Sequence, residues 1–260
     1  MVARPSRTVS FRNAGWPQAE PPEIAALDTQ RRRADIAAVT LKLYFHPFSS
    51  FCQKVLTALY ERDVPFERVV VDLGDAAQRA QLEALWPMAK FPVLRDEAAG
   101  ATVAEASVIV EYLDRRHPGA PLIPGDPEAA LRVRLWDRVF DNYVEHPLQK
   151  AVGDTFRPEG ARDPHGVEEA KMLLQRAYAM TDAELARTGA DWIAGDTFTM
   201  ADCAAAPALF YADMVAPFGD HERLTAYYRR LRARPSFARA VDEARPYRHF
   251  FPLPWPEGHD

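Results

Sequence analysis

The sequence has few cysteines, no long apolar run and no excess of basic residues. Two cysteines in 260 residues exclude a disulfide scaffold and are typical of a reducing compartment. No apolar run approaches the ~20 residues that a membrane-spanning helix needs, because Asp202, Pro207 and Asp213 interrupt the alanine-rich stretch 201–215. The formal net charge is -5, and no basic stripe suggests nucleic-acid binding. We therefore expect a soluble, cytoplasmic protein with no membrane and no nucleic-acid partner.

The composition is that of an ordinary globular protein. Hydrophobic residues make up 48% and charged residues 27% of the chain, which suits one large domain or two small ones. Residues 1–40 differ from the rest, because they are rich in arginine and proline and show no sustained apolar period. We interpret 1–40 as a disordered or loosely attached extension that folding and activity do not need. A targeting signal is the alternative, since the first dozen residues contain no acid.

Apolar spacing predicts alternating strands and helices in the first half of the chain. Leu41–Phe45 alternates as a half-buried strand does, and Phe66–Val71, which ends in three β-branched valines, is predicted to be a second, continuous strand. A helix up to Tyr60 separates these strands, so we expect them to be parallel. The later elements are predicted in the order helix Ala76–Leu85, hairpin strands Pro92–Arg95 and Thr102–Ala104, and helix Ala106–Arg116. The order βαβαββα indicates an α/β domain with a mixed sheet within residues 41–119.

The second half of the chain predicts helices only. Asp126–Glu128 is a helix start, with an Asp cap, a proline at the first position and an acid in the first turn. Thr199 and Asp202 have the spacing of a capping box, with Asp in place of the usual Glu or Gln. We therefore predict an all-helical domain at residues 126–252 and expect Pro252–Asp260 to fray.

The segment Tyr44–Val55 brings two serines to the start of a helix. Pro47 ends the preceding strand, because it has no N–H to donate. Ser50 and Gln53 match the S-x-x-Q capping box, so we expect Ser50 to cap the helix and Gln53 to reach back to it. Ser49 then keeps its hydroxyl free for an anion, which the unpaired N–H groups and the dipole of a helix start favour. The alternative is that both serines only cap.

The sequence from Ser49 to Cys52 has the spacing of a redox C-x-x-C motif whose first cysteine is replaced by serine. Such a site could hold a thiol substrate at the helix start, but it could not form an internal disulfide. The helical period places Cys52 toward the domain interior, so we expect it not to be the nucleophile. Cys203 follows the second capping box and is predicted to be a packed core residue.

Several segments together resemble the cytosolic glutathione transferase family over roughly residues 41–252. Tyr44–Val55 resembles the family's catalytic turn, Lys90–Leu94 its cis-proline segment and Glu105–Leu113 its E-S-x-x-I-x-x-Y-L helix start. Thr199–Pro207 resembles the family's C-terminal capping motif, and Arg234–Phe237 its last-helix signature. Each match is weak alone, but the matches occur together in one chain. The resemblance implies a thioredoxin-like N-terminal domain, an all-helical C-terminal domain and a homodimer.

The turn resembles most closely that of the serine-type, bacterial-like members, which implies glutathione as co-substrate and Ser49 as the catalytic residue. A hydrogen bond to a charged group contributes ~1.5–3 kcal/mol. At about 1.36 kcal/mol per unit, this lowers the pKa of a thiol by roughly one to two units. Ser50 is expected beside the same ligand, mainly as a cap, and no metal site is expected.

The cis-proline segment is implied to hold the middle of glutathione. A cis peptide bond before Pro92 would present the backbone of Phe91 to the cysteinyl part, which would pair with it like an added strand. Lys90 would reach the glycyl carboxylate, although a solvated lysine is the alternative.

The next motif departs from the family at one position. Glu105 lies where the family has its acid, but Ala106 replaces the serine that contacts glutathione. Ser107 comes one residue later, which turns its side chain by ~100° around the helix. The backbone N–H of Ala106 can still bind the γ-glutamyl carboxylate, while the missing hydroxyl would cost ~1.5–3 kcal/mol if its bond were to a charged group. For Glu105 the alternative is an acid that only stabilises its helix.

These observations predict a glutathione transferase that detoxifies small apolar electrophiles. The thiolate would attack an electrophilic carbon by conjugation, displacement or isomerisation. We expect the electrophile site to draw on His46–Phe48 and on the helix around Trp136–Tyr143. The alternative is a non-enzymatic member of the same fold that binds a protein partner or a ligand.

Overall fold

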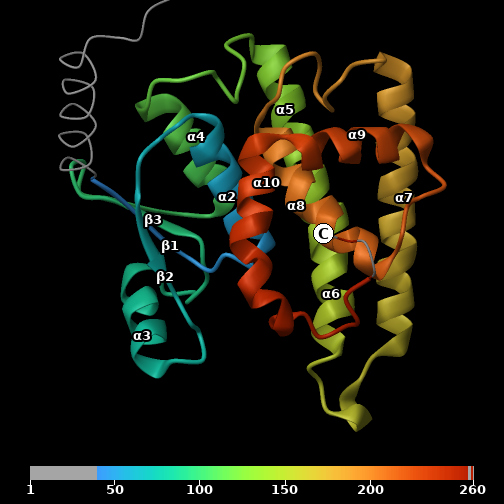
Figure 1. Ribbon diagram of the computed structural model, residues 1–260, viewed down its shortest axis with the longest axis horizontal. Helices are drawn as coiled ribbons and strands as arrows, with labels where there is room; N and C mark the ends of the chain where they lie inside the picture. The colour runs from blue at the N-terminus through green and yellow to red at the C-terminus, as the bar shows by residue number, and fades with distance from the viewer. Residues whose placement is uncertain (1–39, 257–258, 260) are drawn as a thin grey trace, which may run out of the picture. The chain divides into compact units, whose positions relative to one another are not determined.

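The computed structural model describes residues 40–256 and 259. The extension that the sequence predicts lies outside these residues, except for Thr40. Residues from Thr40 onward form a single unit, in which a sheet with its helices precedes a helical part (Figure 1).

The sheet has four strands in the order β2-β1-β3-β4. Strand β1 (Leu41–Phe45) is parallel to β2 (Glu67–Val70) and antiparallel to β3 (Val93–Asp96), and β4 (Ala101–Ala104) closes the hairpin with β3. The predicted parallel pair and the predicted hairpin are both confirmed. The parallel pair follows from the helix between its strands, since a crossover of that length returns the chain in the same direction.

Helices cover both faces of the sheet (Figure 1). Helices α2 (Ser50–Glu61) and α4 (Ala106–Arg116) pack on the face where alternate β1 residues are buried, and α3 (Ala76–Leu85) packs on the other face. Leu43 points to the first face, while the neighbouring Tyr44 packs near Leu82 of α3. The period of two along β1 therefore divides its side chains between two cores.

The helical part surrounds a central, largely buried helix. Its elements are α5 (Pro127–Val139), the π-helical segment η1 (Phe140–Glu145), α6 (His146–Asp154), the 3-10 segment η2 (Glu159–Ala161), α7 (Pro164–Thr188), α8 (Met200–Val215), α9 (Glu222–Ala233), α10 (Pro235–Ala244) and the 3-10 segment η3 (Arg245–Phe250). Helix α8 is the central one, because its alanines let its neighbours approach closely. Helix α2 packs directly on α8 and α10, which joins the two parts of the fold.

The predicted helix starts are found in this part. Asp126 caps α5 by accepting a hydrogen bond from the N–H of Ala129. Thr199 and Asp202 form both bonds of a capping box at α8, and Cys203 is fully buried behind them. The sequence did not predict the π-helical segment that interrupts the helix after Asp126, since no local residue pattern marks it.

The expectation that the residues after Pro252 fray is wrong for the described ones. Trp255 packs near Phe48 and Phe210, and the Nε2 atom of His259 lies 2.9 Å from the carbonyl oxygen of Phe210. The aromatic side chains of this tail cover the apolar end of α8. That partner is distant in sequence, so the tail's own pattern does not reveal it.

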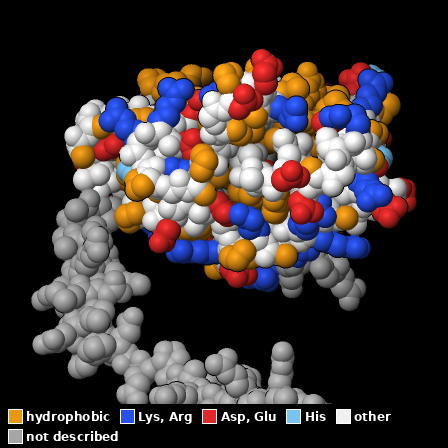
Figure 2. All heavy atoms as spheres, turned by 90° about the horizontal axis from the view of Figure 1, so that it is seen from above, with side chains coloured by type: hydrophobic (Ala, Val, Ile, Leu, Met, Phe, Trp, Pro, Cys, Tyr) orange, Lys and Arg blue, Asp and Glu red, His pale blue; other side chains and the backbone are white. Residues whose placement is uncertain are grey.

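None of the described helices is long and apolar enough to cross a membrane. Acidic and basic side chains are interspersed with apolar ones across the face in Figure 2. This mixture on the visible face differs from the single-sign basic surface of a nucleic-acid-binding domain.

Candidate active site

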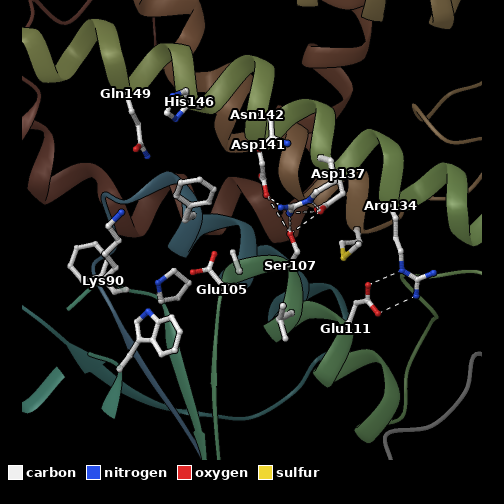
Figure 3. A pocket seen from close by; sticks show the side chains of 18 residues that line it. Lys90, Glu105, Ser107, Glu111, Arg134, Asp137, Asp141, Asn142, His146 and Gln149 are labelled. Carbon is white, nitrogen blue, oxygen red and sulfur yellow. Dashed lines mark hydrogen bonds and ion pairs between the residues drawn. The ribbon is translucent and has the colours of Figure 1, made fainter. Parts of the chain in front are cut away.

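Two adjoining cavities lie between the sheet domain and the helical part. The first has a volume of about 580 Å³ and is lined by Lys90, Phe91 and Pro92, by the start of α4, and by residues of α5, η1 and α6 (Figure 3). The second, of about 370 Å³, is lined by the serines at the start of α2 and by residues of α6, α8 and η3. Gln149 lines both, so the two cavities share a wall.

Ser49, and not Ser50, caps helix α2. Its carbonyl accepts the first helical bond, from the N–H of Gln53 at 2.9 Å, and its Oγ accepts from the N–H of Cys52 at 3.4 Å. The predicted assignment of the cap to Ser50 is therefore wrong. A hydroxyl that accepts in this way still has its own hydrogen to donate. Ser49 can therefore cap the helix and donate to a ligand in the second cavity, which it lines.

The side chains of Ser50 and Gln53 have distant partners instead of local ones. The Ser50 hydroxyl donates to Oε1 of Glu145 at 2.5 Å. The Gln53 amide donates to the carbonyl of Pro47 at 3.0 Å and to the hydroxyl of Tyr211 at 2.9 Å. The predicted reach of Gln53 back to the helix start is therefore wrong as well. Because Gln53 is fully buried, its amide N–H groups need acceptors inside the core, and α8 supplies one of them.

Cys52 faces the interior, as its position in the helical period predicts. The side chain is fully buried, and burial raises the pKa of its thiol to about 12, although hydrogen bonds from Ser49 and from the backbone at His46 oppose the rise. At neutral pH the thiol is therefore almost entirely protonated, and the thiolate is the form that reacts.

A mild alkylating reagent should consequently leave Cys52 unmodified in the native protein, and Cys52→Ala should retain most of the activity. Mass spectrometry after native labelling measures the first, and the same reagent in denaturant is the control, where both Cys52 and Cys203 should react. Rapid native labelling of Cys52 together with loss of activity would contradict this and favour a thiol-redox site.

The start of α4 opens into the first cavity. Glu105, just before the helix, has φ 69°, a left-handed conformation that costs a non-glycine residue of order 1–3 kcal/mol and is concentrated at functional sites. The N–H groups of Ala106, Ser107 and Val108 are in the first turn and have no partner within the helix, and the Glu105 side chain makes no capping bond to them. All three residues line the first cavity. Their unpaired N–H groups and the helix dipole suit an anion.

The Ser107 hydroxyl belongs to a buried network of charges (Figure 3). It donates to Asp137 at 2.8 Å and accepts from the Lys54 ammonium at 2.8 Å. Lys54 also pairs with Asp137 at 2.7 Å and with Asp141 at 2.9 Å. Arg138 pairs with the same two carboxylates and with Ser107. A ligand therefore meets Ser107 mainly through its backbone, because the hydroxyl hydrogen is already donated.

The remaining residues that the sequence singled out also line the first cavity. Lys90 is exposed at its edge (Figure 3). The Phe91–Pro92 peptide bond is cis, as the resemblance implied. The structure thus brings together all the predicted glutathione-binding residues except Ser50, which lies on the second cavity.

The segments that the sequence singled out for the electrophile are divided between the two cavities. The region 136–143 contributes Asp137, Arg138, Asp141 and Asn142 to the first cavity, and the second is lined further along, by residues of α6 such as Leu148. Phe48 does line the second cavity. Sequence reasoning also missed Glu145, whose one signal is an acid placed between the buried Val144 and Leu148.

Comparisons with known proteins agree with this geometry. The family model of the glutathione S-transferase N-terminal domain matches residues 43–121, and that of the C-terminal domain matches residues 164–230. A glutathione S-transferase of Pseudomonas putida is 31% identical over 164 residues, which cover 62% of this chain and 70% of that protein. Glutathione S-transferase 3 of Zea mays is 31% identical over 211 residues, covering 77% of this chain and 93% of that protein.

Among solved structures, a glutathione S-transferase of Methylobacillus flagellatus with glutathione bound has a TM-score of 0.71 and 29% identity. The match covers 77% of this chain and 98% of that one. Both halves of the described fold therefore have counterparts in one kind of protein, and the chain belongs to the glutathione S-transferase family.

Proposed function

We propose that this protein is a serine-type glutathione S-transferase that binds glutathione in the first cavity and a small apolar electrophile in the second. The observation that carries the proposal is the position of Ser49. It starts α2 beside the second cavity, while the start of α4 opens into the adjoining first one. A glutathione held at α4 and Phe91 would lie in the first cavity. Its sulfur would then point toward the adjoining second cavity, where the Ser49 hydroxyl lies.

Ser49 would act by stabilising the thiolate and not by removing its proton. A serine hydroxyl donates a hydrogen bond well but is a poor base at neutral pH. A bond to the charged sulfur is worth ~1.5–3 kcal/mol, and the positive end of α2 adds to it. An ordinary thiol with a pKa of about 8.5 would then be largely ionised near neutral pH.

Glutathione has an anionic group at each end, and the first cavity offers a partner for each. The N–H groups of Ala106 and Ser107 would take the γ-glutamyl carboxylate, with Glu105 near the amino group. The exposed Lys90 would take the glycyl carboxylate at the other side of the cavity (Figure 3). The backbone of Phe91, directly after Lys90, would pair with the cysteinyl part in the middle of glutathione.

The second cavity suits an apolar electrophile, because most of its walls are apolar or aromatic. They include Phe48, Leu148, Val152, Phe156 and Tyr211. Attack by the thiolate in this cavity would conjugate the electrophile with glutathione, displace a leaving group from it or isomerise it. Removing the electrophile in this way is a detoxification reaction, which suits the cytoplasm.

We extend the proposal to a homodimer. Val108 of α4 and Leu131 and Leu135 of α5 are apolar and exposed. An ion pair between Arg134 of α5 and Glu111 of α4 links the two helices. Exposed apolar side chains on two helices that an ion pair links would suit contact with a second copy of the chain.

Titration calorimetry with glutathione tests the proposal, and the Ala106→Ser variant makes the test specific. The parent should bind glutathione saturably at millimolar ligand or below. Ala106→Ser restores a hydroxyl at the start of α4 and should tighten binding by up to about tenfold, if 1.4 kcal/mol is recovered. The change should appear in affinity more than in turnover, because the contact is remote from the sulfur.

Ala106→Cys is the matched control, because it adds a side-chain atom of similar size with only a weak donor. It should not tighten binding. If neither the parent nor Ala106→Ser binds glutathione, the transferase proposal fails, and the alternative of a member that binds a protein partner or another ligand is favoured.

A further inference from the structure

Glu145 is a buried carboxyl group in the wall of the proposed electrophile cavity. It is the last residue of the π-helical segment η1, a kind of segment found frequently at functional sites. Only 3% of the residue is exposed, yet it lines the second cavity together with Ser49. A buried acid is costly unless it is paired, so its partners decide what it can do.

The two oxygens of Glu145 have different surroundings. Oε1 accepts from the Ser50 hydroxyl at 2.5 Å and from the Gln149 amide at 3.0 Å. Oε2 is buried and has no hydrogen-bond partner among the described residues. Both donors thus fix the carboxyl group through one oxygen. The other oxygen is left to carry a proton or to bond with a molecule in the cavity.

Among the residues that the structure describes, no cation bonds directly with Glu145. The charged or titratable groups that act on it are Asp141 of η1, Lys54 of α2 and Tyr211 of α8, which burial keeps neutral, while α6 contributes the neutral Gln149. Burial raises the pKa of Glu145 to about 7, with the donors on Oε1 opposing the rise. Both the acid and the carboxylate are therefore populated near neutral pH, as acid–base catalysis requires.

We propose that Glu145 is the proton donor and acceptor of the transfer reaction, and that the electrophile is one on which thiolate attack leaves negative charge on oxygen, such as an α,β-unsaturated ketone or an epoxide. This inference rests on the proposed glutathione transfer. It adds a second catalytic residue to Ser49 and names the class of electrophile.

The protons balance without any other reagent. With the epoxide, attack forms a carbon–sulfur bond and breaks a carbon–oxygen bond, whose electron pair stays on oxygen. With the unsaturated ketone, attack forms a carbon–sulfur bond at the β-carbon, the alkene π pair forms a new double bond to the carbonyl carbon, and the carbonyl π pair moves to oxygen. Glu145 donates its proton to that oxygen and becomes a carboxylate. It recovers a proton from the thiol of the next glutathione, which leaves a new thiolate beside Ser49. Over one turnover the thiol proton moves to the product.

The Glu145→Gln variant with two substrates tests this. The variant keeps the size of the side chain but cannot donate and recover a proton. With 4-phenyl-3-buten-2-one, kcat should fall about 100-fold, since general acid–base catalysis is worth 10²–10⁴-fold. With 1-chloro-2,4-dinitrobenzene, chloride leaves with the electron pair and needs no proton. The loss there should be at least tenfold smaller.

The pH profile gives a second readout that packing alone would not change. Wild-type kcat for the enone should fall as the pH rises through about 7, where Glu145 loses its proton, and this limb should be absent in Glu145→Gln. Val152→Ala is the matched control, because it alters the same cavity without a titratable group. It should change both substrates by a similar factor.

Equal losses on both substrates in Glu145→Gln would overturn the inference and assign Glu145 to holding the cavity wall. A wild type that consumes the chlorinated substrate but not the enone would overturn it too, while leaving the proposed function intact. A wild type that binds no glutathione in the calorimeter would remove the proposed function, and this inference with it.

Discussion

Ser49→Ala should turn over 1-chloro-2,4-dinitrobenzene about 10- to 100-fold more slowly than the parent near pH 7. The loss of a hydrogen bond worth ~1.5–3 kcal/mol raises the pKa of the bound thiol by roughly one to two units. The thiolate fraction then falls by about the same factor. Ultraviolet difference spectroscopy of bound glutathione should show the loss of thiolate directly, and moving to higher pH should restore part of the rate.

The variant should also be less stable, because Ser49 caps α2. Loss of a serine cap costs ~1 kcal/mol, and a lower melting temperature could by itself reduce activity. Asp75→Ala is the control. Asp75 caps α3 by accepting from the N–H groups of Ala77 and Gln78, and it does not line either cavity. It should lower stability by a similar amount and leave turnover close to that of the parent. If Ser49→Ala loses no more activity than Asp75→Ala, Ser49 is a cap only.

Lys54→Met should lower the free energy of unfolding by about 3–5 kcal/mol, which is the cost of removing one partner of a buried ion pair and leaving the other behind. The Lys54 side chain is 1% exposed and pairs with Asp137 and Asp141. Burial favours the neutral acid, but Lys54, Arg138 and Ser107 together hold the pKa of Asp137 below its usual range. Without the ammonium, a carboxylate that is itself buried keeps only Arg138 and the Ser107 hydroxyl. Denaturant unfolding near neutral pH measures the change.

Two comparisons separate this effect from general damage. Lys42→Met removes a partly exposed lysine of β1 that lies 3.6 Å from Glu67 and 3.8 Å from Glu97, so it should cost at most about 1 kcal/mol. Adding Asp137→Asn to Lys54→Met should recover part of the loss, because it removes the buried carboxylate that has lost its ammonium partner. Similar costs for Lys54→Met and Lys42→Met would show that the buried network contributes little.

The pH dependence of stability should follow the lowered pKa of Asp137. A folded-state pKa below the unfolded one gives stability that is complete above the unfolded pKa and is lost as the pH falls through the folded one. In Lys54→Met this acid-sensitive contribution should be smaller, because the ammonium that lowers the pKa is gone.

Much of the fold could be predicted from the sequence because the signals are local. The alternation in β1 and the helix after it predicted a parallel pair, and the structure pairs Leu43 with Arg68 in that direction. The caps at Asp126 and Thr199 were predicted because a cap bonds within three residues of itself. The left-handed backbone of Glu105 could not be predicted, since nothing in its side chain requires it.

The sequence by itself determined that two serines begin α2 and that a helix start lies at Ala106. Only the tertiary structure decided which serine caps. Ser50 bonds with Glu145, 95 positions away, and Gln53 with Tyr211, 158 positions away. A capping box is a local preference worth ~1 kcal/mol, whereas a buried polar group left without a partner costs ~1–3 kcal/mol. Once the helical part covers α2, the distant partners outweigh the local ones, and the same packing places Glu145 beside Ser49 in a cavity that no local pattern shows.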